Sequence, residues 1–302
     1  MARVAIIGGA GFIGTQTCKE LIASGHEVTV MDLVMPCQPV ENVNYIITDA
    51  TKYNQIYDLL SRGDFDFVYM LAAISDSSEN VRDPLRSIDK NVVSLVNVLQ
   101  CVSKLNIPRI IFSSTVWVYS VANQIEVNEE TDLPMNRCDH IYTTAKLTCE
   151  SLIRNYNTMC GVNYTILRYG IAYGPGCHPD TVLSKFMHNA IDNKPLMITG
   201  GGDISRNFLN VVDHARGNRM AMSTKALNQT INLEGPEKIT IQMVADRVAE
   251  LHGDVEIIHI DERVGDYKGK IVSNNKSREL LNWRPEVDFK HGTKRMYEHI
   301  TK

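Results

Sequence analysis

A glycine-rich turn near the N-terminus constrains this chain more than any other feature. The apolar residues 4–7 lead into Gly8-Gly9-Ala10-Gly11-Phe12-Ile13-Gly14, and a helical pattern follows. Glycines at this spacing allow a tight turn whose backbone can approach a phosphate, and the amides and dipole of the following helix stabilise the anion. The pattern predicts a dinucleotide site between a strand and a helix, with a purely structural turn as the alternative.

An acidic residue at the end of the second predicted strand supports the dinucleotide interpretation. Asp32 follows Gly14 by 18 residues, a position from which a carboxylate can accept hydrogen bonds from the hydroxyls of an adenosine ribose. Its charge would repel a 2′-phosphate, and the next residue, Leu33, offers no compensating positive charge. We therefore expect NAD rather than NADP; a carboxylate that only caps the turn is the alternative.

The first half of the chain alternates short β-rich runs with helical patterns. This order predicts an α/β fold with a Rossmann-type doubly wound parallel sheet. The alternation fails beyond about residue 170, so we predict a NAD-binding domain over residues 1–169 and a smaller C-terminal substrate domain over residues 170–302, with some exchange of strands or helices between them. The predicted strands are 3–8, 27–32, 44–48, 65–71, 109–113 and 163–168, and the predicted helices are 12–24, 52–61, 87–105 and 142–159.

Composition narrows the class of protein. The 302 residues are 44% hydrophobic and 22% charged, which is typical of a soluble globular protein. The net charge of −4 gives no electrostatic footprint for nucleic acid or an anionic membrane. The seven cysteines are odd in number and contain no C-x-x-C pair, as in a reduced compartment without disulfides or zinc. We expect a small-molecule substrate, a cytoplasmic location and no metal.

A tyrosine and a lysine four residues apart carry the candidate chemistry. Tyr142 and Lys146 would lie on one face of the predicted helix, where the cation would lower the pKa of the phenol. Tyr142 could then remove a hydroxyl proton while hydride leaves the same carbon. Thr115 follows a predicted strand and could hold that hydroxyl. These three residues are the predicted catalytic set; a chance pairing and a hydroxyl that only ends the strand are the alternatives.

Together these motifs resemble the extended short-chain dehydrogenases/reductases of the NAD-dependent sugar-nucleotide epimerase/dehydratase family, with UDP-glucose 4-epimerases as the nearest pattern. The similarity covers essentially the whole chain and implies a homodimer formed through the helices at 87–105 and 142–159. The resemblance implies cofactor contacts from Gly8, Gly11, Phe12, Ile13, Gly14, Asp32, Asp49, Ala50, Leu71, Ala72, Ala73, Asn91, Ser113, Tyr142, Lys146 and Tyr169. It implies substrate contacts from Ser75, Thr115, Trp117, Ile171, Arg206, Arg263 and Asp266.

Departures from the family pattern narrow the reaction. Dehydratases and glucuronate decarboxylases of the family usually carry a glutamate where this chain has Trp117, and an indole cannot protonate a leaving hydroxyl. Gly170-Ile171 replaces the family's Phe-Asn and His140-Ile141 replaces its Ser-Pro, which leaves the sugar open. We predict C4 epimerisation of a UDP-hexose through a 4-keto intermediate. The alternatives are an NAD(H)-dependent nucleotide-sugar oxidoreductase or dehydratase and, more remotely, a non-catalytic dinucleotide-sensing protein.

Overall fold

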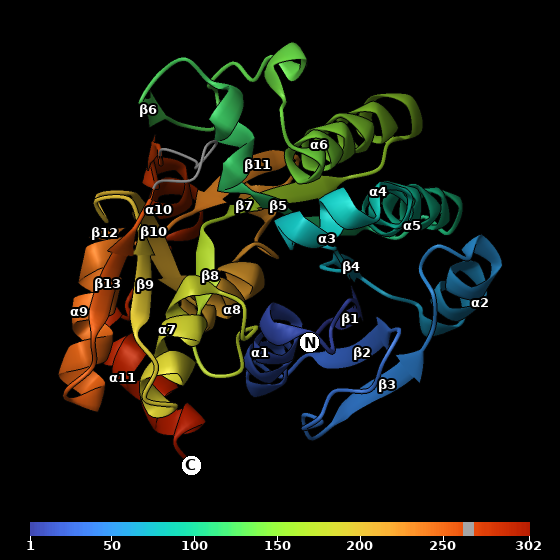
Figure 1. Ribbon diagram of the computed structural model, residues 1–302. Helices are drawn as coiled ribbons and strands as arrows, with labels where there is room; N and C mark the ends of the chain where they lie inside the picture. Colours follow the sequence, from blue (N-terminus) through green and yellow to red (C-terminus); the bar gives the residue numbers. More distant parts are fainter. Residues whose placement is uncertain (262–268) are drawn as a thin grey trace.

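A seven-stranded parallel sheet forms the centre of the computed structural model, which describes residues 1–261 and 269–302 (Figure 1). Its strands are β1 Arg3–Ile7, β2 Glu27–Asp32, β3 Val43–Ile47, β4 Phe67–Met70, β5 Arg109–Thr115, β7 Tyr164–Tyr169 and β11 Gln229–Leu233. Their order is β11-β7-β5-β4-β1-β2-β3, and each neighbouring pair is parallel. Because β1 lies inside the sheet and the chain winds outward on both sides of it, the predicted doubly wound α/β fold is confirmed.

Strand β1 shows why these segments form a sheet that is covered on both faces. Val4 and Ile6 belong to one buried apolar cluster, whereas Ala5 and Ile7 belong to another. Successive side chains of a strand point to opposite faces, so an uninterrupted apolar run needs helices on both sides. The two clusters are those two interfaces between sheet and helices.

Helices from distant parts of the chain cover the two faces of the sheet. The face that holds Ala5 packs against α2 Tyr53–Gly63, α5 Ser94–Lys104 and α6 Ile141–Cys160. The opposite face packs against α1 Phe12–Ala23, α8 Val211–Met220 and α10 Asn275–Leu281. Each cluster joins buried side chains of the strands to apolar side chains of its helices, so the sheet has a separate apolar layer on each face.

The helix predicted over residues 87–105 is divided in the structure. It consists of α4 Pro84–Ile88, the π-helical turn η1 Asp89–Val93 and α5, and the short helix α3 Ser77–Arg82 precedes it. The π turn includes Asn91, whose side chain bonds the backbone of Ile74 rather than facing outward. Such turns inside helices are frequent at functional sites.

The C-terminal part of the chain forms smaller sheets beside the large one. The strands are β8 Ile171–Tyr173, β10 Ser205–Asn210 and β12 Lys238–Thr240 in one sheet, β9 Leu196–Thr199 and β13 Ile257–Ile260 in a second, and β6 Glu126–Val127 and β14 Ile271–Val272 in a third. A third apolar cluster joins strands of these sheets to three helices, and β6, at the upper left of Figure 1, forms a small parallel pair with β14. The helices are α7 Val182–Ile191, α9 Ile241–His252 and α11 Phe289–Ile300, and 3-10 turns occur at η2 Val116–Val121, η3 Met135–Arg137 and η4 Thr224–Ala226.

Two elements from beyond residue 170 belong to the large sheet layer. Strand β11 pairs with β7, and α8 packs beside α1. Asn218 of α8 ties this layer together: its backbone oxygen accepts a bond from the Tyr69 hydroxyl at 2.8 Å, and its amide donates to Thr17 Oγ1 at 2.8 Å. The chain therefore returns to the first layer after residue 170, and the division at residues 169 and 170 stays a prediction.

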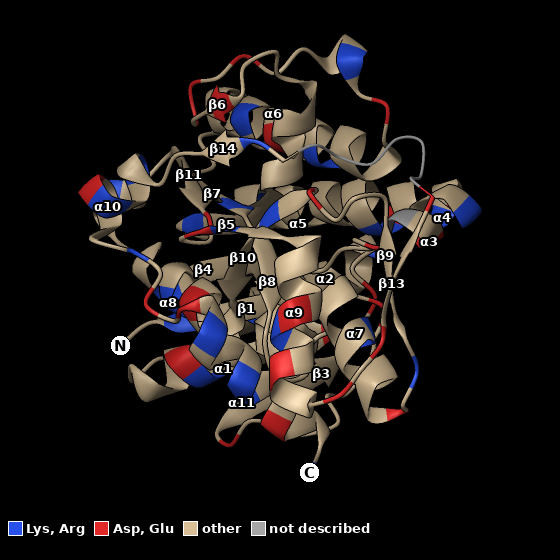
Figure 2. Cartoon of the chain, turned by 60° about the vertical axis from the view of Figure 1, so that its left-hand side comes forward, with Lys and Arg blue, Asp and Glu red and all other residues tan. Residues whose placement is uncertain are grey.

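The outer surface carries charges of both signs. Figure 2 shows Lys, Arg, Asp and Glu interspersed along α1, α8 and α9. Within residues 1–261 and 269–302, no helix combines the length and the apolar character needed to cross a bilayer.

Candidate functional site

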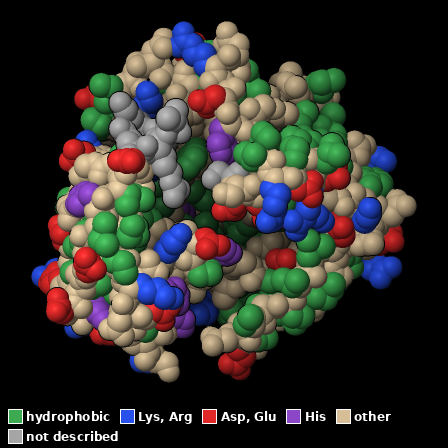
Figure 3. All heavy atoms as spheres, in the orientation of Figure 1, with side chains coloured by type: hydrophobic (Ala, Val, Ile, Leu, Met, Phe, Trp, Pro, Cys, Tyr) green, Lys and Arg blue, Asp and Glu red, His purple; other side chains and the backbone are tan. Residues whose placement is uncertain are grey.

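A cavity of about 660 Å³ runs along the carboxyl ends of the central strands. Figure 3 shows the corresponding hollow between the part that carries α7 and the part that carries α3 and α4. Ligands of doubly wound sheets bind at this edge. The predicted cofactor residues that line the cavity are Gly8, Gly11, Phe12, Ile13, Gly14, Asp32, Asp49, Ala50, Leu71, Ala72, Ala73, Ser113, Tyr142, Lys146 and Tyr169. The predicted substrate residues that line it are Ser75, Thr115, Trp117 and Ile171.

The glycine turn forms a cradle that side chains would fill. Gly8 has φ +87°, and a Cβ there would come within 2.3 Å of the Ala72 nitrogen. A Cβ on Gly14 would come within 2.5 Å of the Gly8 carbonyl oxygen. Gly11 precedes α1 and is less crowded, since the nearest atom to its Cβ would lie 3.6 Å away. The turn thus brings bare backbone and the first amides of α1 to the cavity, which fits the pyrophosphate of a dinucleotide.

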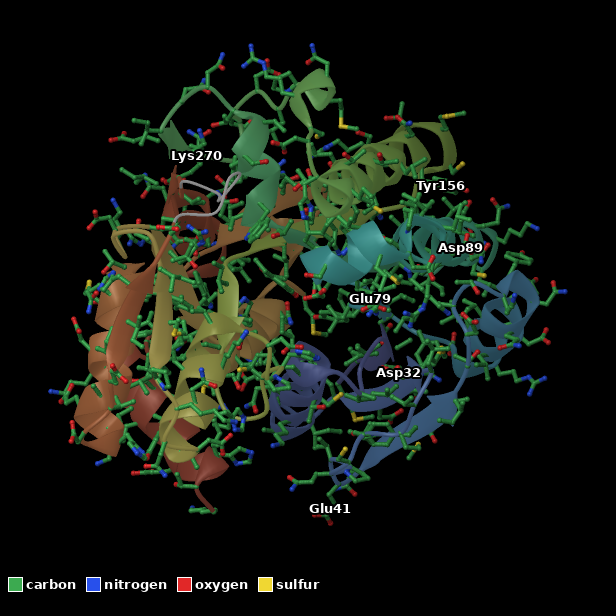
Figure 4. The ribbon with its side chains drawn as sticks, in the orientation of Figure 1. Asp32, Glu41, Glu79, Asp89, Tyr156 and Lys270 are labelled. Carbon is green, nitrogen blue, oxygen red and sulfur yellow. The ribbon has the colours of Figure 1, made fainter. Side chains whose placement is uncertain are left out.

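Asp32 serves two purposes at the end of β2. Its Oδ2 accepts a bond from the Ala10 amide of the turn at 2.9 Å, and its Oδ1 accepts one from the Leu33 amide at 2.7 Å. The carboxylate therefore does cap the turn, and it also lines the cavity. Because each carboxylate oxygen accepts more than one bond, Asp32 retains capacity for ribose hydroxyls. In Figure 4, Asp32 lies at the end of β2 with Glu79 of α3 above it.

A lysine that sequence reasoning missed lies in the cavity beside Asp49, a predicted cofactor residue. Lys90 of η1 lines the cavity, and its Nζ bonds Asp49 Oδ1 at 2.9 Å. Burial acts to raise the pKa of Asp49, but hydrogen bonds from Lys90 and Thr51 lower it overall. Arg86 of α4 also lines the cavity and pairs with Glu79. No sequence motif marks these two cations, because their approach depends on the packing of α4 and η1 over the sheet.

Among the predicted cofactor residues, Asn91 lies outside the wall of the cavity. It does not line the cavity, and both groups of its side-chain amide are occupied: Oδ1 accepts from the Ile74 amide at 2.8 Å, and Nδ2 donates to the Ile74 carbonyl at 3.1 Å. Ile74 and Ser75 line the cavity. Asn91 therefore acts on the site through the segment that it holds.

The three predicted catalytic residues meet at one end of the cavity. Thr115 is the last residue of β5, and Tyr142 and Lys146 lie in the first turns of α6. Lys146 is 3% exposed, and its Nζ donates to the Ser113 carbonyl at 2.6 Å. The same nitrogen lies 4.7 Å from the centre of the Phe112 ring and 5.7 Å from that of Tyr142. The cation thus lies over the ring of Tyr142, as in a cation–π contact.

Burial has a larger effect on the Tyr142 pKa than the sequence suggested. Burial raises this pKa well above the ordinary value, and a hydrogen bond with Thr115 opposes the rise. Burial also lowers the pKa of Lys146, to about 8. Burial therefore outweighs the lowering of the Tyr142 pKa that was expected from the Lys146 cation. The reason is geometric: the ammonium bonds a backbone carbonyl and lies over the ring.

A family model matches the part of the chain that carries the glycine turn, Asp32 and the predicted catalytic residues. Residues 4–233 match the model of a family described as "NAD dependent epimerase/dehydratase family". The chain belongs to this family. The family predicted from the sequence and its cofactor, NAD, are thereby confirmed.

Several named proteins are similar to this chain over nearly their full length. The UDP-glucuronate 4-epimerase of Thermodesulfobacterium geofontis is 25% identical over 312 residues, covering 98% of this chain and 95% of that protein. The crystal structure of the Thermotoga maritima UDP-glucose 4-epimerase with UDP-glucose has a TM-score of 0.91 at 26% identity, covering 99% of this chain and 98% of that one. The Bacillus cereus UDP-glucuronic acid 4-epimerase with UDP-glucuronic acid and NAD has a TM-score of 0.89 at 25% identity, covering 99% of each chain.

The cavity has an aromatic wall beside Thr115. Trp117 lines the cavity, and its indole meets the His140 ring edge-to-face with ring centres 5.9 Å apart. The Trp117 backbone amide donates to Thr115 Oγ1 at 3.2 Å, so the threonine hydroxyl keeps its own proton to donate. His140 directly precedes α6. Trp117 and His140, two of the positions that depart from the family pattern, are therefore in contact.

Of the remaining predicted substrate residues, the structure describes only Arg206. Arg206 belongs to β10, donates from NH1 to the Ser205 carbonyl at 2.9 Å and does not line the cavity. Arg263 and Asp266 lie outside the described residues. The predicted substrate contact of Arg206 stays a prediction.

A loop after β8 contributes residues that the motifs did not predict. Cys177, His178 and Thr181 line the cavity, and Cys177 Sγ lies 3.4 Å from Thr181 Oγ1. The Gly-Pro-Gly turn directly before Cys177 is the feature of the sequence that marks this loop. The loop brings the C-terminal part of the chain to the same cavity as the glycine turn.

Proposed function

We propose that this protein catalyses the C4 epimerisation of a UDP-hexose through a 4-keto intermediate, with NAD retained throughout. One arrangement carries the proposal: Thr115, Tyr142 and Lys146 share one cavity with the glycine turn. A dinucleotide held at that turn would extend toward the catalytic residues. Epimerisation consumes no net oxidant, because the hydride removed from the sugar carbon returns to it.

The side chains of the site would handle the proton of the C4 hydroxyl. Thr115 would hold that hydroxyl by donating its own proton, and Tyr142 would take the hydroxyl proton and later return it. Lys146 would stabilise the phenolate form of Tyr142 by its charge. When bound, NAD supplies the hydride acceptor and, in its oxidised form, a positive charge that favours the phenolate. The glycine turn and Asp32 would hold the cofactor, and the cavity walls would exclude water from the ketone.

Trp117 supports epimerisation over dehydration. An eliminated hydroxyl must receive a proton, and the indole that lines this end of the cavity has no acidic proton to give. Its flat apolar face instead suits the C–H face of a pyranose ring. The relatives that are named UDP-sugar 4-epimerases support the same choice of substrate class.

We further propose that the protein is a homodimer of the cytoplasm that joins through α5 and α6. Val92, Val96, Leu152 and Tyr156 lie in this region and are only partly buried within the chain. Apolar side chains at helical spacing that remain half-exposed suit a four-helix contact with a second copy. All seven cysteines are free, which supports a reducing compartment. The charge of −4 supports the absence of nucleic acid and membrane partners.

The decisive experiment tests substrate and cofactor use together. The purified protein is incubated with UDP-, GDP-, CDP- and dTDP-sugars without added cofactor, and NMR follows the interconversion of epimers. We expect a UDP-hexose to reach an equilibrium mixture, and we expect denatured protein to release NAD. A strict requirement for added NAD(H), with release of a keto or reduced sugar, would contradict the proposal and indicate an oxidoreductase.

A further inference from the structure

Two hydrogen bonds one helical turn apart join the end of β5 to α6. Lys146 Nζ donates to the Ser113 carbonyl at 2.6 Å, and the Ser114 hydroxyl donates to Glu150 Oε1 at 2.6 Å. Lys146 and Glu150 are four residues apart and therefore lie on one face of the helix. Consecutive residues of the strand are thus held by the same helix that carries the catalytic tyrosine and lysine.

Glu150 is a fully buried carboxylate that two arginines balance. Arg168 of β7 donates from Nε to Oε1 at 2.9 Å and from NH2 to Oε2 at 2.7 Å, and Arg154 of α6 donates to Oε2 at 2.9 Å. Burial acts to raise the Glu150 pKa, but the bonds and charge of Arg168 outweigh it, so this pKa lies below its ordinary value. The carboxylate is therefore ionised at neutral pH, a state that a buried acid reaches only when it is paired.

Glu150 is also an ionised carboxylate one helical turn from Lys146. Burial lowers the Lys146 pKa to about 8, while Cys149 and Glu150 act in the opposite direction. Burial raises the pKa of the Cys149 thiol to about 12, so this thiol is neutral where the lysine titrates. The phenol of Tyr142 is neutral there as well, because burial raises its pKa. From the sheet, Lys146 meets the Phe112 ring and the Ser113 carbonyl, neither of which titrates.

We propose that Glu150 is a positioning residue of the catalytic site, which keeps Lys146 cationic and, through Ser114, fixes the end of β5 against α6. Glu150 does not line the cavity and acts through these two residues. Arg168 supplies the counter-charge that allows a carboxylate to remain there. The link from Glu150 to turnover rests on the proposed function, whereas the link from Glu150 to Lys146 does not.

The titration of Lys146 tests the electrostatic half of this proposal without any substrate. Protein labelled with ¹³C-lysine is titrated by NMR, and the Lys146 signal is assigned from its loss in Lys146→Met. We expect Glu150→Gln to lower the Lys146 pKa by about one unit, because an adjacent opposite charge has been removed. Glu150→Asp should keep the pKa near that of the parent. An unchanged Lys146 pKa in Glu150→Gln overturns the proposal.

Two further variants separate charge from structure. Ser114→Ala removes only the hydroxyl bond, so it should lower kcat without moving the Lys146 pKa; an equal pKa shift in this variant would also overturn the proposal. If Glu150→Gln does not fold, the double variant Glu150→Gln/Arg168→Met replaces the buried pair with neutral side chains of similar size. It should still lower the Lys146 pKa, by less, since the repelling charge of Arg168 is removed too.

Turnover measurements then connect the pair to catalysis. With a UDP-hexose substrate, the decline of kcat at alkaline pH should begin at lower pH in Glu150→Gln, because the cation is lost earlier. A fall in kcat at every pH with an unmoved alkaline decline would indicate a structural role only and would overturn the catalytic link. If the parent protein turns over no nucleotide sugar, the proposed function fails while the NMR titration still decides the role of Glu150.

Discussion

The carboxyl group of Glu234 occupies the space that a side chain at Gly170 would need. A Cβ on Gly170 would come within 2.2 Å of Glu234 Oε1. Glu234 is 3% exposed, and its carboxyl accepts a bond from the Gly235 amide at 2.8 Å. Gly170 lines the cavity, so the buried carboxyl of Glu234 lies directly behind this part of the cavity wall.

This carboxyl predicts a pH dependence of stability. Burial raises the pKa of Glu234 from 4.5 to about 8, against the bond from Gly235. The folded state therefore holds a proton that the unfolded state has released between these values, and stability falls as pH rises from about 5 to 8. Glu234→Gln removes this loss, on the order of a few kcal/mol. Urea unfolding at pH 5 and pH 8 measures it; an equal loss of stability in both proteins would show that Glu234 ionises without cost.

Replacing Gly8 in the glycine turn should both strain the backbone and weaken the binding of NAD. Gly8→Ala forces a side chain into a left-handed conformation and against the backbone of Ala72. Gly25 also has positive φ, +79°, but its Cβ would meet nothing within 4 Å. Both variants should lose about 1 kcal/mol or more of stability from strain, whereas only Gly8→Ala should lose NAD. NAD released by denaturation, measured per mole of protein, checks this; equal retention in the two variants would contradict the cradle.

Replacing Tyr142 should reduce turnover without reducing the binding of NAD. Tyr142→Phe removes the phenolic proton carrier and keeps the ring over which Lys146 lies, so kcat should fall about 10²- to 10⁴-fold while NAD content stays near that of the parent. Tyr156→Phe is the matched control on the same helix, since it removes only a bond to Gln100. Substantial turnover by Tyr142→Phe would assign the proton transfer to another residue.

Replacing Trp117 should lower the affinity for the UDP-sugar. Trp117→Ala removes the aromatic wall and should raise KM for the UDP-sugar roughly fivefold, equivalent to about 1 kcal/mol of binding. Trp117→Phe should recover most of this affinity. NAD content should be unchanged in both variants, because the glycine turn and Asp32 are separate from this wall. A variant that loses NAD but keeps its KM would place the indole on the cofactor.

The sequence by itself determined those features that depend on neighbours along the chain. The central strands follow from apolar runs that must be buried on both faces, and the cradle follows from glycines that alone tolerate its conformation and crowding. The positions of Asp32 and of Tyr142 and Lys146 follow from fixed spacings on a strand and a helix. Among the residues that line the cavity are Gly8, Gly11, Gly14, Asp32, Tyr142 and Lys146.

Only the tertiary structure decided which distant groups meet. In the folded chain, β11 pairs with β7, and Asn91 bonds the backbone of Ile74. The Lys146 ammonium donates to the Ser113 carbonyl, and Arg168 pairs with Glu150. The carboxyl of Glu234 fills the space beside Gly170. Burial and charge at such contacts depend on elements that packing brings together, so local spacing predicts which residues enter the site, while packing sets their pKa values and their partners.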